Sequence, residues 1–273
     1  MPLSPVRSIS GTSVDRRRRM ATARALPEEE AVAIVCNGTT QAVMMATPQD
    51  LHDLAAGFAL TEGYVAGVAE IQGFEVVEHP QGLEARLWID AARAEALGAR
   101  RRAMAGPVGC GLCGIESLAE AARDLPRVAT PALRLSHEDV AGATEALRRH
   151  QPMHDQTRAV HAAGFLRPGE GIVMAREDVG RHNALDKLIG ALARAGIDPA
   201  AGAFVLTSRV SVEMVQKCAM AGCPVLVAVS APTAHAVRLA EGAGITLAAF
   251  ARGSGYDLFT HPGRIAGGEA DVA

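Results

Sequence analysis

The fold is decided by two apolar runs, Ala203-Phe-Val-Leu-Thr207 and Val225-Leu-Val-Ala-Val229. Each run is as long as a typical strand, and almost every position in it is apolar. That pattern is typical of parallel strands that are buried on both faces. Gly171–Ala175 and Ile245–Phe250 have the same character. We therefore expect all of these runs to lie in one buried sheet.

The stretches between these runs carry apolar residues at helical spacing. The stripes are Ala184, Leu185, Leu188, Ile189 and Leu192, then Val212, Val215 and Ala219, then Ala236, Val237 and Ala240. Strands that alternate with helices form right-handed crossovers, so the sequence predicts an α/β domain with a mostly parallel sheet flanked by helices.

The first half of the chain has a different pattern. Ala31–Cys36, the pair Asn37-Gly38 and Gln41–Met45 read as a strand, a tight turn and a returning strand. A helix is expected from Thr47–Asp50 to Gly63, followed by strands near 74–77 and 85–89. We divide the chain into a mobile tail without regular structure at 1–27, a small α+β domain at 28–128 and the α/β domain at 129–273.

Composition excludes several function classes. The 27 basic and 30 acidic residues give a net charge of −3, so no overall charge favours nucleic acid or an anionic membrane. No apolar run approaches the roughly 20 residues that a membrane helix needs, and no signal core follows the basic cluster Arg16–Arg19. We expect a cytoplasmic protein. Its five cysteines are an odd number and do not suggest a disulfide framework.

Polar segments follow each strand of the predicted sheet: Arg176–Asn183, Ser208–Ser211, Ser230–Thr233 and Arg252–Gly255. Ligands of such sheets bind beyond the carboxyl ends of the strands. The guanidinium group of arginine and the free backbone N–H groups at helix N-termini both donate hydrogen bonds to phosphate oxygens. We therefore predict a site for a phosphate-bearing anion. The alternative is that the hydroxyls only cap helices and that the charged run is a solvated ion-pair cluster.

Gly109-Cys-Gly-Leu-Cys-Gly114 surrounds two thiols with glycine, which leaves the sulfur atoms open to a partner. A helix is expected to start just after it, and a helix N-terminus stabilises thiolate. Persulfide transfer, a redox pair and half of a zinc site with Cys218 and Cys223 remain open readings. We expect Cys36, Cys218 and Cys223 to be core residues. Two histidines, His161 and His182, could handle protons, contact a ligand or be structural.

The segment Arg176-Glu-Asp-Val-Gly-Arg-His-Asn-Ala-Leu-Asp-Lys187 resembles the signature of the formate dehydrogenase accessory sulfurtransferase family, FdhD. Other segments resemble motifs of that family in the family's order: Gly109–Gly114, Ser208–Lys217, Ser230–Thr233 and Phe250–Gly255. The match to the family runs from about Ala31 to Ile265.

The resemblance implies a cytidine-deaminase-like C-terminal domain, a smaller N-terminal domain and a homodimer. It implies that Cys110 carries the persulfide and that Cys113 is its motif partner. Sulfur would come from a cysteine desulfurase and pass to the molybdenum bis(molybdopterin guanine dinucleotide) cofactor before delivery to apo formate dehydrogenase. A guanine nucleotide would mimic that cofactor. The alternatives are a non-catalytic cofactor chaperone and a zinc protein with four cysteine ligands.

The predicted cofactor contacts come from the resemblance and from the strand ends. The resemblance implies Phe250, Ala251, Arg252, Gly253, Ser254 and Gly255. The strand ends add Arg176, Asp178, Arg181, His182, Ser208, Arg209, Ser230 and Thr233. No resident metal is expected, because His161-Ala-Ala163 lacks the glutamate of the deaminase zinc motif.

Two positions depart from the family's pattern. Thr157-Arg158-Ala159 stands where the family usually has a glycine after the threonine, so a bulky charge replaces a small residue. Ser208-Arg209 also lacks the glycine that is often found between these two residues. We expect the local backbone to differ from the family at both places.

Overall fold

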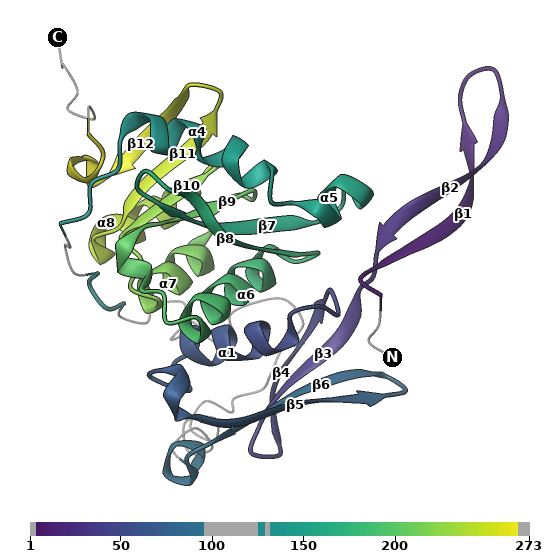
Figure 1. Ribbon diagram of the computed structural model, residues 1–273, viewed down its shortest axis with the longest axis horizontal. Helices are drawn as coiled ribbons and strands as arrows, with labels where there is room; N and C mark the ends of the chain where they lie inside the picture. The colour runs from purple at the N-terminus through teal and green to yellow at the C-terminus, as the bar shows by residue number, and fades with distance from the viewer. Residues whose placement is uncertain (1–3, 96–124, 129–131, 267–273) are drawn as a thin grey trace.

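The computed structural model describes residues 4–95, 125–128 and 132–266, and these form three sheets with helices packed on two of them (Figure 1). The largest sheet has six strands in the order β12-β11-β10-β9-β7-β8, and a second has four in the order β4-β3-β6-β5. The third is a two-stranded ribbon, β1-β2. Within the described residues, no helix is long and apolar enough to cross a membrane.

The six-stranded sheet contains all four strands that the sequence predicted. Its strands are β7 (His161–Arg167), β8 (Gly171–Asp178), β9 (Ala203–Leu206), β10 (Val225–Ala228), β11 (Thr246–Arg252) and β12 (Gly255–Thr260). Strands β9, β10 and β11 are parallel neighbours. Strand β7 pairs antiparallel with both β8 and β9, so β8 runs in the same direction as β9. The carboxyl ends of β8 to β11 therefore share one edge, as predicted.

The sheet is less parallel than we predicted. Two strands that the sequence analysis did not identify, β7 and β12, run against the others. Strand β12 is an edge strand with alternating exposed residues, and it lacks the continuous apolar run of a buried strand. The expectation of a mixed α/β architecture is confirmed, and the mostly parallel sheet is correct only for β9 to β11.

Helices cover both faces of this sheet. On one face lie α6 (Arg181–Arg194), α7 (Val212–Met220) and α8 (Ala234–Ala243), which share a core with Phe165, Phe204 and Leu226. Helix α4 (His137–Arg148) covers the other face, where it packs on Val205 and Val227. Successive residues of β9 and β10 thus enter opposite cores, which explains why these strands are apolar throughout.

The smaller sheet comprises β3 (Glu30–Cys36), β4 (Thr39–Ala46), β5 (Ile71–His79) and β6 (Gly82–Ile89), with α1 (Leu51–Thr61) on one face. Asn37 and Gly38 both have positive φ, at 47° and 77°, and connect the paired residues Cys36 and Thr39. This is the two-residue turn predicted from Asn-Gly. The strands and the helix predicted for this part of the chain are confirmed, with boundaries that differ by a few residues.

Helix α1 of the small sheet lies directly on α6 of the large one (Figure 1). A Cβ atom on Gly57 of α1 would stand 1.8 Å from the carbonyl oxygen of Asp186, and one on Gly190 of α6 would stand 2.0 Å from that of Asp53. Real side chains cannot approach backbone so closely. Only glycine at both positions allows the two helices to meet at this distance.

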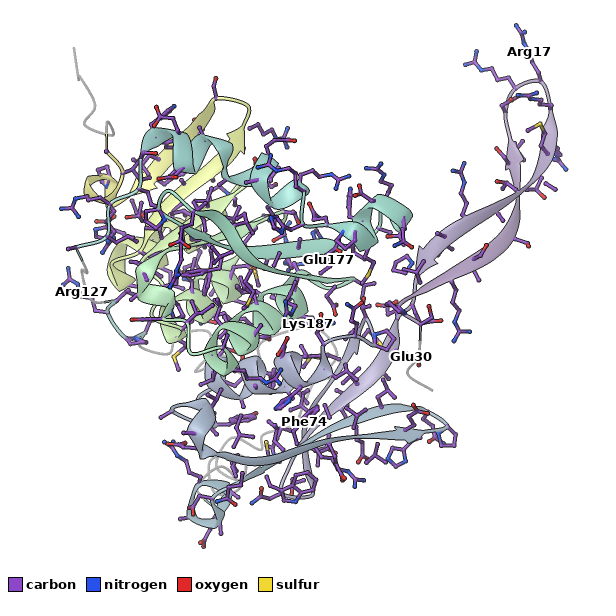
Figure 2. All side chains as sticks on the ribbon, viewed as in Figure 1. Arg17, Glu30, Phe74, Arg127, Glu177 and Lys187 are labelled. Atoms are coloured by element: carbon purple, nitrogen blue, oxygen red, sulfur yellow. The ribbon has the colours of Figure 1, made fainter. Side chains whose placement is uncertain are left out.

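Buried ion pairs surround this glycine contact. The Lys187 ammonium lies 2.6 Å from the Asp178 carboxylate, both side chains are 0% exposed, and the ammonium also donates to the Thr47 carbonyl oxygen at 2.9 Å. On the far side of the contact the Lys217 ammonium lies 2.9 Å from Asp186. Figure 2 shows Lys187 at the junction of the two parts of the molecule.

Two ion pairs at Asp53 join the two parts of the molecule directly. Arg176 on β8 contacts the Asp53 carboxylate of α1 at 2.8 Å, and Arg194 of α6 also pairs with Asp53. Two arginines from the layer of the large sheet thus form ion pairs with the Asp53 carboxylate. Much of the signature segment 176–187 therefore serves this junction.

The expectation of no regular structure in residues 1–27 is wrong. Strands β1 (Val6–Val14) and β2 (Arg19–Pro27) form an antiparallel ribbon that extends away from the rest of the molecule (Figure 1). Most of its residues are exposed. Neither face of the ribbon covers a core, so the apolar alternation that identifies strands is weak in this segment. The Asp15 carboxylate accepts hydrogen bonds from the backbone of Arg17 and Arg18 and shapes the turn.

The departure from the family at Arg158 lies at a strained backbone position. Arg158 terminates α5 (Pro152–Thr157) with φ 57° and ψ 18°, the left-handed conformation that favours glycine. A small residue is expected here because a Cβ atom crowds the following carbonyl in this conformation. The helix thus ends on an arginine in a backbone conformation that favours glycine.

We predict that Gly57→Ala and Gly190→Ala each lower the free energy of unfolding by roughly 3 kcal/mol, because the added methyl would overlap backbone at the helix contact. Urea denaturation followed by circular dichroism measures this change. The matched control is Gly142→Ala in α4, where an added Cβ meets nothing within 4 Å. That substitution should stabilise the protein by about 0.5–1 kcal/mol. A similar small effect at all three glycines would show that α1 and α6 are not in close contact.

We also predict that Arg158→Gly raises the free energy of unfolding by about 0.5–1 kcal/mol, since it relieves a left-handed residue that carries a side chain. The same denaturation experiment applies. Arg149→Gly is the control: Arg149 ends α4 with φ −73°, so glycine relieves nothing there and should not stabilise. Stabilisation by both substitutions, or by neither, would contradict the assignment of strain to Arg158.

Candidate functional site

Three of the predicted polar segments lie side by side at the carboxyl ends of the parallel strands. The Val210 amide donates to the Ala231 carbonyl at 3.2 Å, and the Thr233 amide donates to the Val210 carbonyl at 2.9 Å. The Phe250 amide donates to the Ser230 carbonyl at 3.4 Å. We call the segments 208–211, 230–233 and 250–255 the strand-end rim. Their predicted juxtaposition is confirmed, and backbone hydrogen bonds hold it.

An exposed aromatic side chain marks the third segment of the rim. Phe250 is 45% exposed and has φ 54°, a conformation that is rare for a bulky residue. The β11–β12 register shifts between Ala249 and Arg252, so Phe250 stands at a bulge in the ladder. Strained, exposed residues of this kind are concentrated at binding sites. Arg252 and Gly253 continue the segment as an exposed turn.

Not every predicted contact in this segment is open. Ala251 is buried, and its carbonyl accepts a hydrogen bond from the Thr144 hydroxyl at 3.1 Å. The Ser254 carbonyl lies 3.1 Å from His137 of α4. These two contacts fix the backbone of the turn against α4. The groups that a ligand can reach are therefore the Phe250 ring, the Arg252 side chain and the exposed backbone from Gly253 to Gly255.

A second group of polar side chains lies where α6 and α7 begin. His182 Nε2 is buried, lies 4.0 Å from the Glu213 carboxylate and has no hydrogen-bond partner among the described residues. Burial lowers the pKa of His182 to about 4, and the positive charges of Arg181 and Lys217 act in the same direction. At neutral pH the ring is therefore uncharged.

His161 belongs to the same group. It begins β7, and its Nδ1 lies 3.5 Å from the Thr207 hydroxyl at the end of β9. Burial lowers the pKa of His161, and the neighbouring Arg181 charge adds to this effect. Both histidines that the sequence analysis identified thus lie beside the guanidinium of Arg181, whose Nε is buried without a partner in the described structure.

Other predicted contacts have partners inside the molecule. Arg176 and Asp178 are held by Asp53 and Lys187 at the junction of the two sheets, and Asp178 is 0% exposed. The Thr233 hydroxyl accepts from the Ala236 amide at 3.1 Å and so caps α8, which was the alternative reading of that residue. We do not include these three side chains in the candidate site.

Ser208 is also withdrawn from the surface. It is buried, and its hydroxyl donates to the carbonyl of the next residue, Arg209. Besides Phe250 and Arg252, the rim therefore offers Arg209 and Ser230 from the predicted set. Arg181 and His182 belong to the second group, at the start of α6. Glu213 is a site residue that the sequence analysis missed. Its only signal is an acidic residue in the first turn of a helix that begins at the predicted edge.

The two motif cysteines, Cys110 and Cys113, lie outside the described residues. The three cysteines within them, Cys36, Cys218 and Cys223, are all buried. Cys218 donates to the Cys223 carbonyl at 3.3 Å, and burial raises the pKa of Cys36 to about 11. Their predicted assignment to the core is confirmed. Among the described residues there is no group of three or more His, Cys, Asp or Glu side chains arranged to hold a metal.

We predict that a nuclear magnetic resonance titration places the pKa of His182 near 4. Arg181→Gln should raise it and Glu213→Gln should lower it further, because the two charges act in opposite directions. A free histidine has a pKa of about 6.5, so as the pH falls the unfolded chain binds a proton at this residue before the folded chain does. The contribution of His182 to the free energy of unfolding is therefore lost as the pH falls from about 6.5 through 4. A wild-type pKa close to 6.5 would show that the ring is solvated.

Comparison with known proteins assigns the chain to a family. The model of the FdhD/NarQ family matches residues 27–266. The sulfur carrier protein FdhD of Agrobacterium fabrum is 54% identical over 242 residues, which are 89% of each chain. The protein of the same name from Xanthomonas campestris pv. campestris is 46% identical over 268 residues, 97% of this chain and 95% of its own.

A solved structure shares the fold. The crystal structure of a protein described as a formate dehydrogenase accessory protein, from Desulfotalea psychrophila, superimposes with a TM-score of 0.77 at 24% identity, over 96% of this chain and 100% of that one. At this identity the likeness concerns the fold. The family model and the relatives with about half of their residues in common carry the assignment: this chain belongs to the FdhD/NarQ family.

Proposed function

We propose that this chain is a sulfur carrier that takes sulfur from the persulfide of a cysteine desulfurase and passes it to a molybdenum cofactor destined for formate dehydrogenase. Membership of the FdhD/NarQ family and relatives named sulfur carrier protein FdhD support this proposal. The protein would act in the cytoplasm as a homodimer. Its partners would be the desulfurase and apo formate dehydrogenase.

The burial of the other cysteines is the observation that carries the proposal. A persulfide carrier needs a thiol that ionises readily and that a donor protein can reach. Cys36, Cys218 and Cys223 fail the second requirement, since all three lie in cores. The sequence has five cysteines, so Cys110 and Cys113 are the two that can carry sulfur.

In the proposed reaction the Cys110 thiolate attacks the outer sulfur of the donor persulfide. A new S–S bond forms at Cys110, the donor S–S bond breaks, and the donor leaves as a thiolate. Attack by the Cys113 thiolate on the Cys110 sulfur then releases the outer sulfur as hydrosulfide for the molybdenum centre. It leaves a Cys110–Cys113 disulfide that a cellular dithiol reduces.

The strand-end rim would hold the cofactor, molybdenum bis(molybdopterin guanine dinucleotide), as the substrate. The Arg252 and Arg209 guanidinium groups suit its pyrophosphates, and the exposed Phe250 ring suits a flat guanine base. A guanine nucleotide should therefore bind as a mimic, and Arg252→Ala should weaken it.

Two alternatives make different predictions. A non-catalytic chaperone would hold the cofactor without moving sulfur, so Cys110→Ala would still support formation of active formate dehydrogenase. A zinc protein with four cysteine ligands would need the Cys218 and Cys223 thiols. Those thiols instead donate to backbone carbonyls inside a core, which argues against zinc.

We predict that incubation of the full chain with a cysteine desulfurase and cysteine adds the mass of sulfur to the protein, and that intact-mass spectrometry places it on Cys110. Cys110→Ala should abolish the addition, because Cys110 is the proposed acceptor and the other three cysteines outside the motif are buried. Cys113→Ala should still accept sulfur but should release it slowly. Treatment with a dithiol should remove the added mass in every case.

Cys36→Ala is the matched control, since it removes a buried thiol and should leave the labelling unchanged. Equal labelling of the wild type and Cys110→Ala would overturn the assignment of the carrier residue. If Cys110→Ala supported normal formate dehydrogenase activity, the chaperone alternative would replace sulfur transfer.

A further inference from the structure

A pocket of about 300 Å³ lies apart from the strand-end rim, and its lining is strongly basic. Three arginines from three separate segments, Arg127, Arg134 and Arg264, line it together with His261. The backbone at Gly244 and Gly263 completes the wall. Among the described residues that line it, none is an aspartate or a glutamate. Such a pocket concentrates positive potential in a partly enclosed space.

Arg264 is the most deeply placed of these charges. It is 5% exposed, and its Nη1 donates to the Thr246 hydroxyl at 2.9 Å. Its Nε is buried and has no hydrogen-bond partner among the described residues. Burial lowers the pKa of Arg264, and the Arg134 charge adds to this effect. A buried guanidinium without a carboxylate is costly, and a bound anion would compensate for that cost.

A neighbouring carboxylate belongs to a different contact. Glu241 lies 3.7 Å from His261 Nε2, and the same ring nitrogen is 2.8 Å from the Glu241 carbonyl. The Glu241 side chain is mostly exposed and is not part of the pocket wall. Arg134 contacts only the Leu133 carbonyl among the hydrogen bonds of the described residues. The arginines therefore remain available to a ligand.

The pocket lies at the opposite end of the strands from the rim. Thr246, which contacts Arg264, begins β11, whereas Phe250 and Arg252 of the rim lie at its end. The Val128 amide donates to the Ala243 carbonyl at the end of α8, and the Leu135 amide donates to the Arg264 carbonyl. Figure 2 shows Arg127 on the opposite side of the molecule from Glu177.

We propose that this pocket binds a phosphate-type anion, such as a phosphate monoester or pyrophosphate. Arginine donates forked hydrogen bonds that match phosphate oxygens, and three guanidinium groups suit a ligand with more than one negative charge. The volume is at the small end of ligand sites, so it fits a phosphate group and not a whole dinucleotide. This site is separate from the proposed sulfur transfer and does not depend on it.

The test is isothermal titration calorimetry, which measures the affinity of the full chain for inorganic pyrophosphate at low ionic strength. Arg127→Ala and Arg134→Ala should each weaken binding by about tenfold, since each removes a charge-assisted contact. Arg264→Lys should weaken it too, because it keeps the charge but loses the fork. Thermal unfolding of each variant checks that the fold is retained, and Arg127→Ala and Arg134→Ala keep the proposal testable if Arg264→Lys does not fold.

Arg238→Ala is the matched control, because it removes an exposed arginine of α8 outside the pocket lining. It should bind pyrophosphate within about twofold of the wild type. Absence of binding, or equal binding by the pocket variants, would overturn the proposal. Loss of binding on Arg252→Ala would move the ligand to the rim, and equal affinity for succinate would refute a phosphate site. Sulfur loading of Cys110 should be the same in Arg127→Ala, Arg134→Ala and Arg238→Ala as in the wild type.

Discussion

The contact between α1 and α6 at Gly57 and Gly190 is the constraint on which the rest of the structure depends. It brings two helices from different halves of the chain so close that backbone meets backbone. Around it, Lys187 and Asp178 form an ion pair with no exposure to water, and Lys217 pairs with Asp186. Burying charge is costly unless every group is paired, and the Thr47 backbone and hydroxyl supply the further hydrogen bonds. Glycine fixes the distance between the helices, and the Thr47 hydrogen bonds together with the ion pairs of Asp53 to Arg176 and Arg194 join the two parts of the molecule.

A structural feature could be predicted from the sequence when the residues that cause it are neighbours along the chain. Strands β9 and β10 were predictable because each is buried on both faces, and the Asn37-Gly38 turn because its conformation demands those residues. Strand β12 was not predicted because it is an edge strand with alternating exposed residues. Strand β7 is buried along its middle, but its alanines and glycine carry little strand signal. We predicted Arg176 and Asp178 as ligand contacts because a charged run that follows a strand often binds a ligand. Their partners include Asp53 and Thr47, which lie 123 and 131 residues earlier, so only the tertiary structure could place them.

The large sheet presents different chemistry at its two ends. At the carboxyl ends of β9 to β11, backbone hydrogen bonds align three loops beside a neutral histidine and an exposed aromatic ring. At the amino end of β11, the chain gathers arginines from segments that are distant in sequence. In the proposed function, such separation would keep a small anion at one end from competing with a large ligand at the other. The rigid strands between them keep the two regions apart.

The β1–β2 ribbon has a further consequence. Within the part of the chain that the structure describes, both of its outer edges display backbone N–H and C=O groups without a neighbouring strand, and such edges can recruit a strand from another molecule. Residues 16–19 are all arginine, and Figure 2 shows Arg17 at the tip of the ribbon. When two ribbons approach side by side in the same orientation, these charges repel each other, which opposes stacking of the chain into aggregates. The basic tip thereby protects an otherwise adhesive element from uncontrolled self-association.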